Sequence, residues 1–250
     1  MKFRRIKNEL SVMTLIAIKD IKIYYSKPPV IMFGLLWPSF MFLSFLIKRQ
    51  LDPVEVFGGL SSITLFFMAS SIGPVVIPIE KRQGTYDRFL SAPISLLALV
   101  LSKTLPGMIF GIIIALIPLI IGVVFGTSIS NIPFFFLFLV LGGFCFSSLG
   151  ILFSSFQVQN TGSIMIGTNL IRLPSLFISG IFLELNEIPL IILPLSFISP
   201  LTYANDLLNW SLSSEITALP WIIDIIALIA FSILFVFLSV RLHETARRKT

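Results

Sequence analysis

The sequence predicts an all-α integral membrane protein with six transmembrane helices. Hydrophobic residues make up 56% of the 250-residue chain, charged residues make up only 12%, and the mean hydropathy is +1.00. Soluble domains usually carry about 25% charged residues, so we expect lipid to be the solvent of this chain. Each span needs about 20 residues to cross the hydrocarbon. The length therefore suits a single membrane domain over residues 1–250.

The first element is a predicted amphipathic helix over residues 1–27. It begins with basic residues, and Leu10, Met13, Ala17, Ile21 and Tyr24 then recur at helical spacing. We predict an interfacial helix on the cytoplasmic leaflet, and the alternative is a solvated basic tail.

The uninterrupted apolar runs predict the spans. We expect them at residues 30–47, 56–79, 104–125, 132–153, 162–182 and 220–240, with Lys103 interrupting a weaker apolar stretch before the third. Residues 183–219 differ, because their apolar pieces 188–198 and 201–208 are too short to span. Pieces of this length are typical of re-entrant or interfacial helices.

The distribution of lysine and arginine predicts the orientation. With the N-terminus inside, fifteen of the eighteen basic residues fall on the cytoplasmic side. The segment 183–219 holds four acids and no base, so we place it outside. An even number of spans then puts both termini in the cytoplasm of a multi-pass protein of the cell membrane.

Several function classes are excluded by what the sequence lacks. Cys145 is the only cysteine and His243 the only histidine, so neither a disulfide nor a cysteine–histidine metal site is expected. No phosphate-binding Gly-x-x-x-x-Gly-Lys-[Ser/Thr] pattern occurs. No set of nucleophile and base suggests an enzyme. We expect no cofactor, and no nucleic-acid partner, because the basic residues lie at membrane boundaries.

The densest polar cluster between the two ends of the chain is the segment 80–93. Glu80 opens it, Gly84 allows backbone angles closed to other residues, and Thr85 is a plausible N-cap with Asp87 in the first helical turn. The sequence predicts a short helix over 86–90 that ends before Pro93. A charged helix of this size lies at or beyond the membrane surface, where it can be touched.

This segment resembles the cytoplasmic loop of ABC-2 type transporter permeases. The family pattern is approximately Glu-[Lys/Arg]-Glu-x-Gly-Thr-x-Glu-x-Leu-Leu-x-x-Pro. The residues that match in register are Glu80, Lys81, Gly84, Thr85, Leu90 and Pro93, with Asp87 and Phe89 as conservative variants and Arg82 as a departure. A second stretch, 176–182 followed by Pro189 and 199–206, is similar to the family's conserved region before the last span.

The resemblance implies a permease of an ATP-driven exporter. Two permease copies would pair, as a homodimer, and each would receive a separate ATP-binding subunit on its cytoplasmic face. The segment 80–93 would be the coupling helix, and 183–209 would cap the outer side of the pathway. The residues expected to couple to the ATPase are Glu80, Lys81, Arg82, Gly84, Thr85, Asp87, Arg88, Phe89 and Leu90.

Arg172 lies inside the predicted span over 162–182. A charge at mid-membrane costs from about 3 to more than 10 kcal/mol, depending on the method. Arg172 therefore either faces a pathway, where it would attract an anionic or polar head group, or makes a structural pairing. Asp224 and the backbone carbonyls freed by Pro174 are the candidate partners. Asp224 itself is expected at the membrane interface.

An ion-coupled secondary transporter or channel is the alternative class. It requires titratable groups inside the membrane, and the sequence offers only Arg172 and Asp224. Dependence on a separate ATPase distinguishes the two classes.

Overall fold

The computed structural model describes residues 2–25, 34, 36, 39–40, 43, 53–71, 73–91, 94–156, 161–182, 185, 188–212 and 217–247. The described residues form helices and connecting turns, with no strand among them, which confirms the all-α class. Within the described part of the chain, four helical stretches have the length and apolar character of membrane spans: Val56–Arg82, Leu96–Val124, Ile132–Ser155 and Trp221–Thr245. A shorter apolar helix covers Gly162–Ile178. The predicted first span, 30–47, lies outside the described residues apart from scattered positions.

The helices follow one another in the predicted order. They are α1 (Lys2–Asp20) with the π-helical turn η1 (Ile21–Tyr25), α3 (Pro53–Ser71), α4 (Gly73–Arg82), α5 (Thr85–Ser91), α6 (Leu96–Val124), α7 (Ile132–Leu137) continuing through the π-helical turn η2 (Phe138–Gly142) into α8 (Gly143–Ser155), α9 (Thr161–Ile178), α10 (Leu193–Ser196), α11 (Pro200–Leu212) and α12 (Trp221–Arg247).

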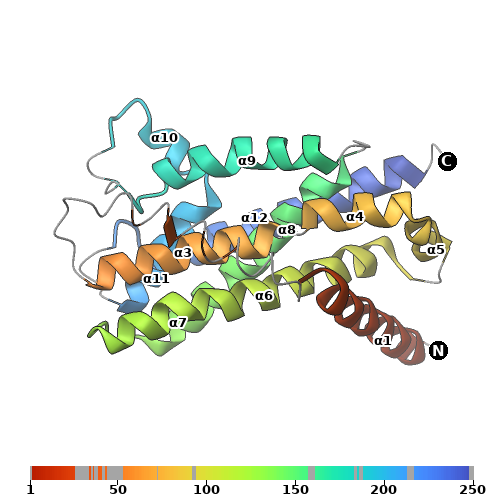
Figure 1. Cartoon of the computed structure of the whole chain (residues 1–250), viewed down its shortest axis with the longest axis horizontal. Helices are drawn as coiled ribbons and strands as arrows, with labels where there is room; N and C mark the ends of the chain where they lie inside the picture. Colours follow the sequence, from red (N-terminus) through yellow and green to blue (C-terminus); the bar gives the residue numbers. More distant parts are fainter. Residues whose placement is uncertain are drawn as a thin grey trace.

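The long helices run along the length of the molecule and separate two ends (Figure 1). Helices α1 and α5 and the C-terminal part of α12 lie at one end, which we call the α5 end. Helices α10 and α11 and the start of α7 lie at the other, which we call the α11 end. Both chain termini therefore lie at the α5 end.

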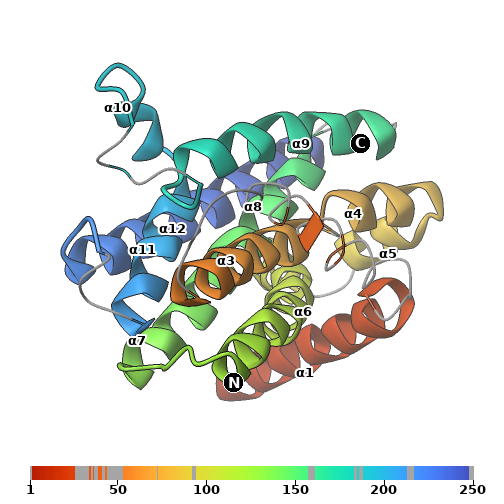
Figure 2. The same cartoon turned by 60° about the vertical axis from the view of Figure 1, so that its left-hand side comes forward.

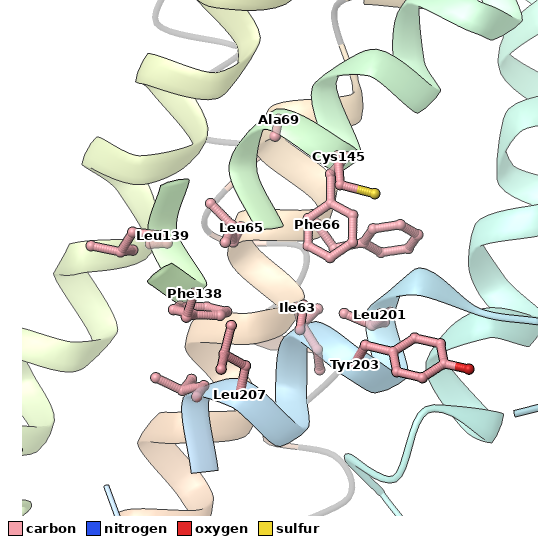
Figure 3. Close-up of a cluster of buried hydrophobic side chains, with 14 of the residues drawn as sticks. Ile63, Leu65, Phe66, Ala69, Phe138, Leu139, Cys145, Leu201, Tyr203 and Leu207 are labelled. Atoms are coloured by element: carbon pink, nitrogen blue, oxygen red, sulfur yellow. The ribbon is translucent and has the colours of Figure 1, made fainter. Parts of the chain in front are cut away.

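Helix α3 occupies the centre of the bundle. It packs against α6, α8 and α11 (Figure 2), and residues 61–70 are all buried. A helix that is apolar on every side is expected to be buried on every side. Ile63, Leu65 and Phe66 of α3 meet side chains of η2, α8 and α11 in the main core (Figure 3).

Two glycines allow α3 to approach its neighbours closely. A Cβ atom on Gly107 of α6 would lie 2.6 Å from the carbonyl oxygen of Ala69, and one on Gly150 of α8 would lie 2.7 Å from that of Ser70. Neither position has room for a side chain, so small residues set the distance between these helices, as is common in membrane bundles.

Three predicted boundaries shift in the structure. Helix α6 begins at Leu96 and passes through Lys103 without a break, because the lysine is buried against acidic side chains rather than solvated. Helix α12 extends beyond residue 240 to Arg247. Helix α9 ends at Ile178 rather than 182, and Gly180, with φ of +80°, turns the chain away.

The apolar residues predicted for the first helix are divided between two faces of α1. Leu10 is exposed, whereas Ile16, Ala17 and Asp20 are buried. The inward face of α1 therefore includes an acid. Exposed Leu10, Leu15, Ile18 and Ile23 give the same end of the chain an outward apolar surface, as an interfacial helix requires.

Candidate functional site

The segment 80–93 forms a helix, a turn and a second short helix. Helix α4 ends at Arg82, residues 83 and 84 make the turn, and α5 covers Thr85–Ser91. Gly84 has φ of +66°, and a Cβ built on it meets nothing within 4 Å. Glycine is therefore favoured there by the left-handed backbone and not by lack of space. Asp87 and Leu90 lie in α5, but their side chains are outside the described set.

Thr85 does not act as the N-cap that the sequence predicted. It is the first helical residue of α5, and its hydroxyl donates a hydrogen bond of 3.2 Å to the carbonyl oxygen of Glu80. This bond closes the turn back onto α4, so Thr85 sets the angle at which α5 leaves the preceding helix.

Glu80 is completely buried and belongs to a cluster of charges contributed by three helices. Its Oε1 atom accepts hydrogen bonds from Nζ of Lys19 in α1, at 2.5 Å, and from Nζ of Lys103 in α6, at 2.6 Å. Lys103 also donates to Oδ2 of Asp20 at 2.9 Å. We call Lys19, Asp20, Glu80 and Lys103 the charge cluster. Its two acids and two bases balance.

Pairing is what makes the burial of these charges tolerable. An isolated buried ion costs several kcal/mol, and only close partners with good hydrogen bonds offset that cost. Lys19, which is partly exposed, illustrates the balance: burial opposes its charge, but hydrogen bonds to Asp20 and Glu80 outweigh the burial and raise its pKa. The cluster thereby holds α1, α4 and α6 in one arrangement.

Phe89 connects the short helix α5 to this cluster. Its ring centroid lies 4.9 Å from Nζ of Lys19 and 5.1 Å from Nζ of Lys103. Ammonium groups within about 6 Å of an aromatic face are attracted to it. Phe89 is thus a predicted coupling residue whose side chain points inward, onto α1 and α6.

The outward side of the segment is basic. Arg82, Gln83, Gly84 and Arg88 are exposed, and Lys81 is partly exposed with its Nζ 5.2 Å from the ring centroid of Tyr86. The predicted site residues therefore divide into two groups. Glu80, Thr85 and Phe89 face the protein, while Arg82 and Arg88 face solvent.

Sequence reasoning missed Asp20 and Lys103 as members of the site. A usable signal existed, since a charge between apolar residues needs a partner, and Lys103 precedes an uncharged run. The same argument singled out Arg172, whereas the position of Lys103 between two apolar stretches is also typical of a span boundary.

Arg172 makes neither of the structural pairings predicted for it. Its Nη2 donates to the carbonyl oxygen of Ser70, its Nη1 donates to Oγ of Ser71 at 3.3 Å, and its guanidinium carbon lies 5.6 Å from the ring centroid of Phe67. The carbonyl of Ser70 lacks a helical donor because the residue four positions on, Pro74, has no N–H. The freed carbonyl is on α3, and Pro174 has no part in it.

Asp224, which the sequence places at the membrane interface, is fully buried within the protein. It lies in the first turn of α12, and neither carboxylate oxygen has a hydrogen-bond partner among the described residues. Asp206 of α11, also buried, accepts bonds of 2.8 Å from the backbone N–H groups of Ala218 and Leu219. Burial raises the pKa of Asp206, and these two bonds work against that rise.

The fold and site define the class of protein. Apolar helices of membrane length, joined by a short charged helix at the end where both termini lie, make this a multi-pass membrane protein. The profile of the ABC-2 type transporter family matches residues 13–213, and the chain belongs to that family.

Two curated relatives from Escherichia coli (strain K12) are similar to this chain. "Probable multidrug ABC transporter permease YbhS" is 24% identical over 188 residues, covering 72% of this chain and 48% of its own length. "Probable multidrug ABC transporter permease YbhR" is 25% identical over 155 residues, covering 58% of this chain and 41% of its own. The chain thus spans about half the length of the curated relatives it matches.

Proposed function

We propose that this chain is the membrane permease subunit of an ATP-driven exporter. In this proposal it pairs with a second copy in the cell membrane, with both termini in the cytoplasm. ATP binds to and is hydrolysed by a separate subunit that docks on the segment 80–93. The membership of the family and the descriptions of YbhS and YbhR support the transporter class. Their multidrug description makes export of chemically varied small molecules the transport to test first.

The observation that carries the proposal is the two-sided construction of the corner formed by the end of α4 and by α5. Arg82 and Arg88 face solvent, whereas Phe89 and Glu80 are bound to α1 and α6. A helical corner that is exposed on one side and bound to neighbouring helices on the other can be displaced by a docked partner. It then transmits that displacement to those helices as a rigid-body movement.

The charge cluster suggests how the displacement spreads. Because Glu80 bonds directly to Lys19 and Lys103, a movement of the α4–α5 corner acts on α1 and α6 together. The ATPase supplies energy only if its contact with the segment differs between the permease conformations. Arg82 and Arg88 are therefore the contact residues in our proposal, and Glu80 and Phe89 transmit the movement.

Site-specific cross-linking tests the docking. A photo-reactive residue is placed at Arg88 or Gln83 in the full chain, in native membranes that contain its ATPase. We expect a cross-linked P-loop ATPase from both positions. The matched control is Ile191, which is 91% exposed at the α11 end and is expected to give no such product.

A charge-reversal pair tests the function of the contact. We expect Arg88→Glu to reduce the co-purified ATPase activity, while Arg241→Glu, at an exposed arginine of α12 near the same end, leaves it unchanged. Equal retention of ATPase by both variants would remove the segment from the docking surface.

The ion-coupled alternative is favoured by one observation, the burial of Asp224 without a hydrogen-bond partner among the described residues. If no P-loop ATPase cross-links or co-purifies, transport would be measured against proton and sodium gradients instead. Loss of gradient-driven transport in Asp224→Asn would then support this class.

A further inference from the structure

A second buried connection leaves α5 in a different direction from the charge cluster. The hydroxyl of Tyr86 lies 2.7 Å from Nδ1 of His243 in α12, and Nε2 of the same ring lies 3.1 Å from Oγ of Ser155, at the end of α8. Tyr86 is 3% exposed and His243 1% exposed. Tyr86, His243 and Ser155 have no part in the docking and transmission proposed above.

The contact of Ser155 with Ile151 indicates which groups donate in the two hydrogen bonds of a neutral His243 ring. The hydroxyl of Ser155 donates its single proton to the carbonyl oxygen of Ile151, at 2.9 Å, so its oxygen accepts from His243 and Nε2 carries the ring proton. The other ring nitrogen of a neutral histidine is then an acceptor, and Nδ1 receives the proton of Tyr86. The tautomer follows from the network rather than from observed hydrogens.

The hydrogen bond from Tyr86 to His243 therefore links α5 specifically to α12. Phe89 and Thr85 connect α5 to α1, α4 and α6, whereas Tyr86 reaches α12. Helix α12 also packs along α8 and against α11. At a rise of about 1.5 Å per residue, its 27 residues connect the α5 end with the α11 end.

We propose that His243 is a positioning residue that ties α12 to the coupling helix, so that displacement of α5 is carried to the α11 end through α12. The proposal rests on the proposed function, since it needs an ATPase to move α5. It adds a route that the resemblance did not imply, because every residue that the resemblance assigned to coupling lies in the segment 80–93. From the sequence, His243 was expected beyond the last span, which was predicted to end at residue 240.

Distance measurements on the full complex test this route without a known substrate. Spin labels on cysteines at Ile120 of α6 and Ile226 of α12, both exposed and in the halves of these helices toward the α11 end, report the separation of the two helices with and without trapped nucleotide. Cys145, the only native cysteine, is buried. The variants are Tyr86→Phe, which removes one oxygen and keeps the ring, and His243→Leu. Tyr24→Phe is the matched control. It also removes a tyrosine hydroxyl, but Tyr24 takes no part in the contacts between Tyr86, His243 and Ser155.

We expect nucleotide to change the distance in the parent protein and in Tyr24→Phe. We expect Tyr86→Phe and His243→Leu to lose at least half of that change while still co-purifying with the ATPase. If the change persists in full in Tyr86→Phe, or is absent from the parent although the ATPase is bound, the route through His243 is overturned and the permease proposal stands. If no ATPase co-purifies with the parent, both proposals fall. Should His243→Leu not fold, Tyr86→Phe alone decides.

Discussion

The two ends of the molecule bury charge in opposite ways. At the α5 end, four charged residues from α1, α4 and α6 meet in a cluster in which Glu80 and Lys103 both have close partners of opposite sign. At the α11 end, two acids of the same sign are buried on adjoining helices, and Asp224 lacks a hydrogen-bond partner among the described residues.

This difference has a physical consequence for function. A balanced cluster fixes the relative positions of the helices that contribute to it, because any movement separates bonded charges. A carboxylate without a hydrogen-bond partner raises the free energy of the folded state. The α5 end is therefore built to move as a unit, while the α11 end carries a destabilising group that stability alone does not explain.

Among the variants that test the difference between the two ends, Glu80→Leu is expected to change the free energy of unfolding most. It leaves Lys103 buried and sharing Asp20 with Lys19, and breaking a buried pair in this way typically costs about 3–5 kcal/mol. We expect that loss in the free energy of unfolding of the purified protein, measured by thermal denaturation at constant lipid and detergent.

The matched control for this prediction is Glu80→Leu combined with Lys103→Met. The combined variant keeps Lys19 and Asp20, which remain an ion pair at 2.8 Å. We expect it to be at least half restored relative to Glu80→Leu alone. A double variant as unstable as the sum of the two single losses would show that the cluster does not act through pairing.

Asp224→Asn is expected to stabilise the protein. The amide is nearly the same shape and carries no ionic charge, so the free energy of unfolding should rise by about 1–3 kcal/mol. The neighbouring Asp206→Leu should lower it by a similar amount, because the N–H groups of Ala218 and Leu219 lose their acceptor. Changes of opposite sign in the free energy of unfolding of the two variants, measured in one melting series, would support the contrast between the two ends. A destabilised Asp224→Asn would contradict it.

Arg172→Met is expected to lower the free energy of unfolding by about 1–3 kcal/mol, because it leaves the buried carbonyl of Ser70 without a donor. In a Pro74→Ala background, where the helix supplies its own N–H, we expect the cost of Arg172→Met to fall by at least half. An equal cost in both backgrounds would show that Arg172 does not act by satisfying the carbonyl freed by Pro74. A stability unchanged by Arg172→Met would instead favour its hypothesised role in binding substrate.

The sequence predicted much of the fold because the features that decide it are local. The length and apolar character of the runs over 132–153 and 220–240 located their helices to within a few residues, except where α12 continues to Arg247. The unusual backbone angle of Gly84 and the short helix after it were also readable, since turns and helix ends depend on neighbouring residues.

The candidate site was only partly readable. Glu80 was selected for its position in a motif, but nothing local shows that it is buried or that its partners lie 61 and 23 residues away. The donor to the carbonyl freed by Pro74 is likewise 102 residues away. His243 fell beyond the predicted last span because the apolar run ends near residue 240, whereas α12 continues to Arg247.

The sequence by itself determined that this is a membrane protein and where most of its helices lie. It also identified the short polar helix between the apolar ones. These features follow from hydrophobicity and backbone preference, which act over a few neighbouring residues. Only the tertiary structure decided which charges meet, which carbonyl Arg172 satisfies and that Tyr86 reaches α12. Each of these contacts requires atoms from distant segments to come within about 3 Å, and that proximity is a property of the packed bundle.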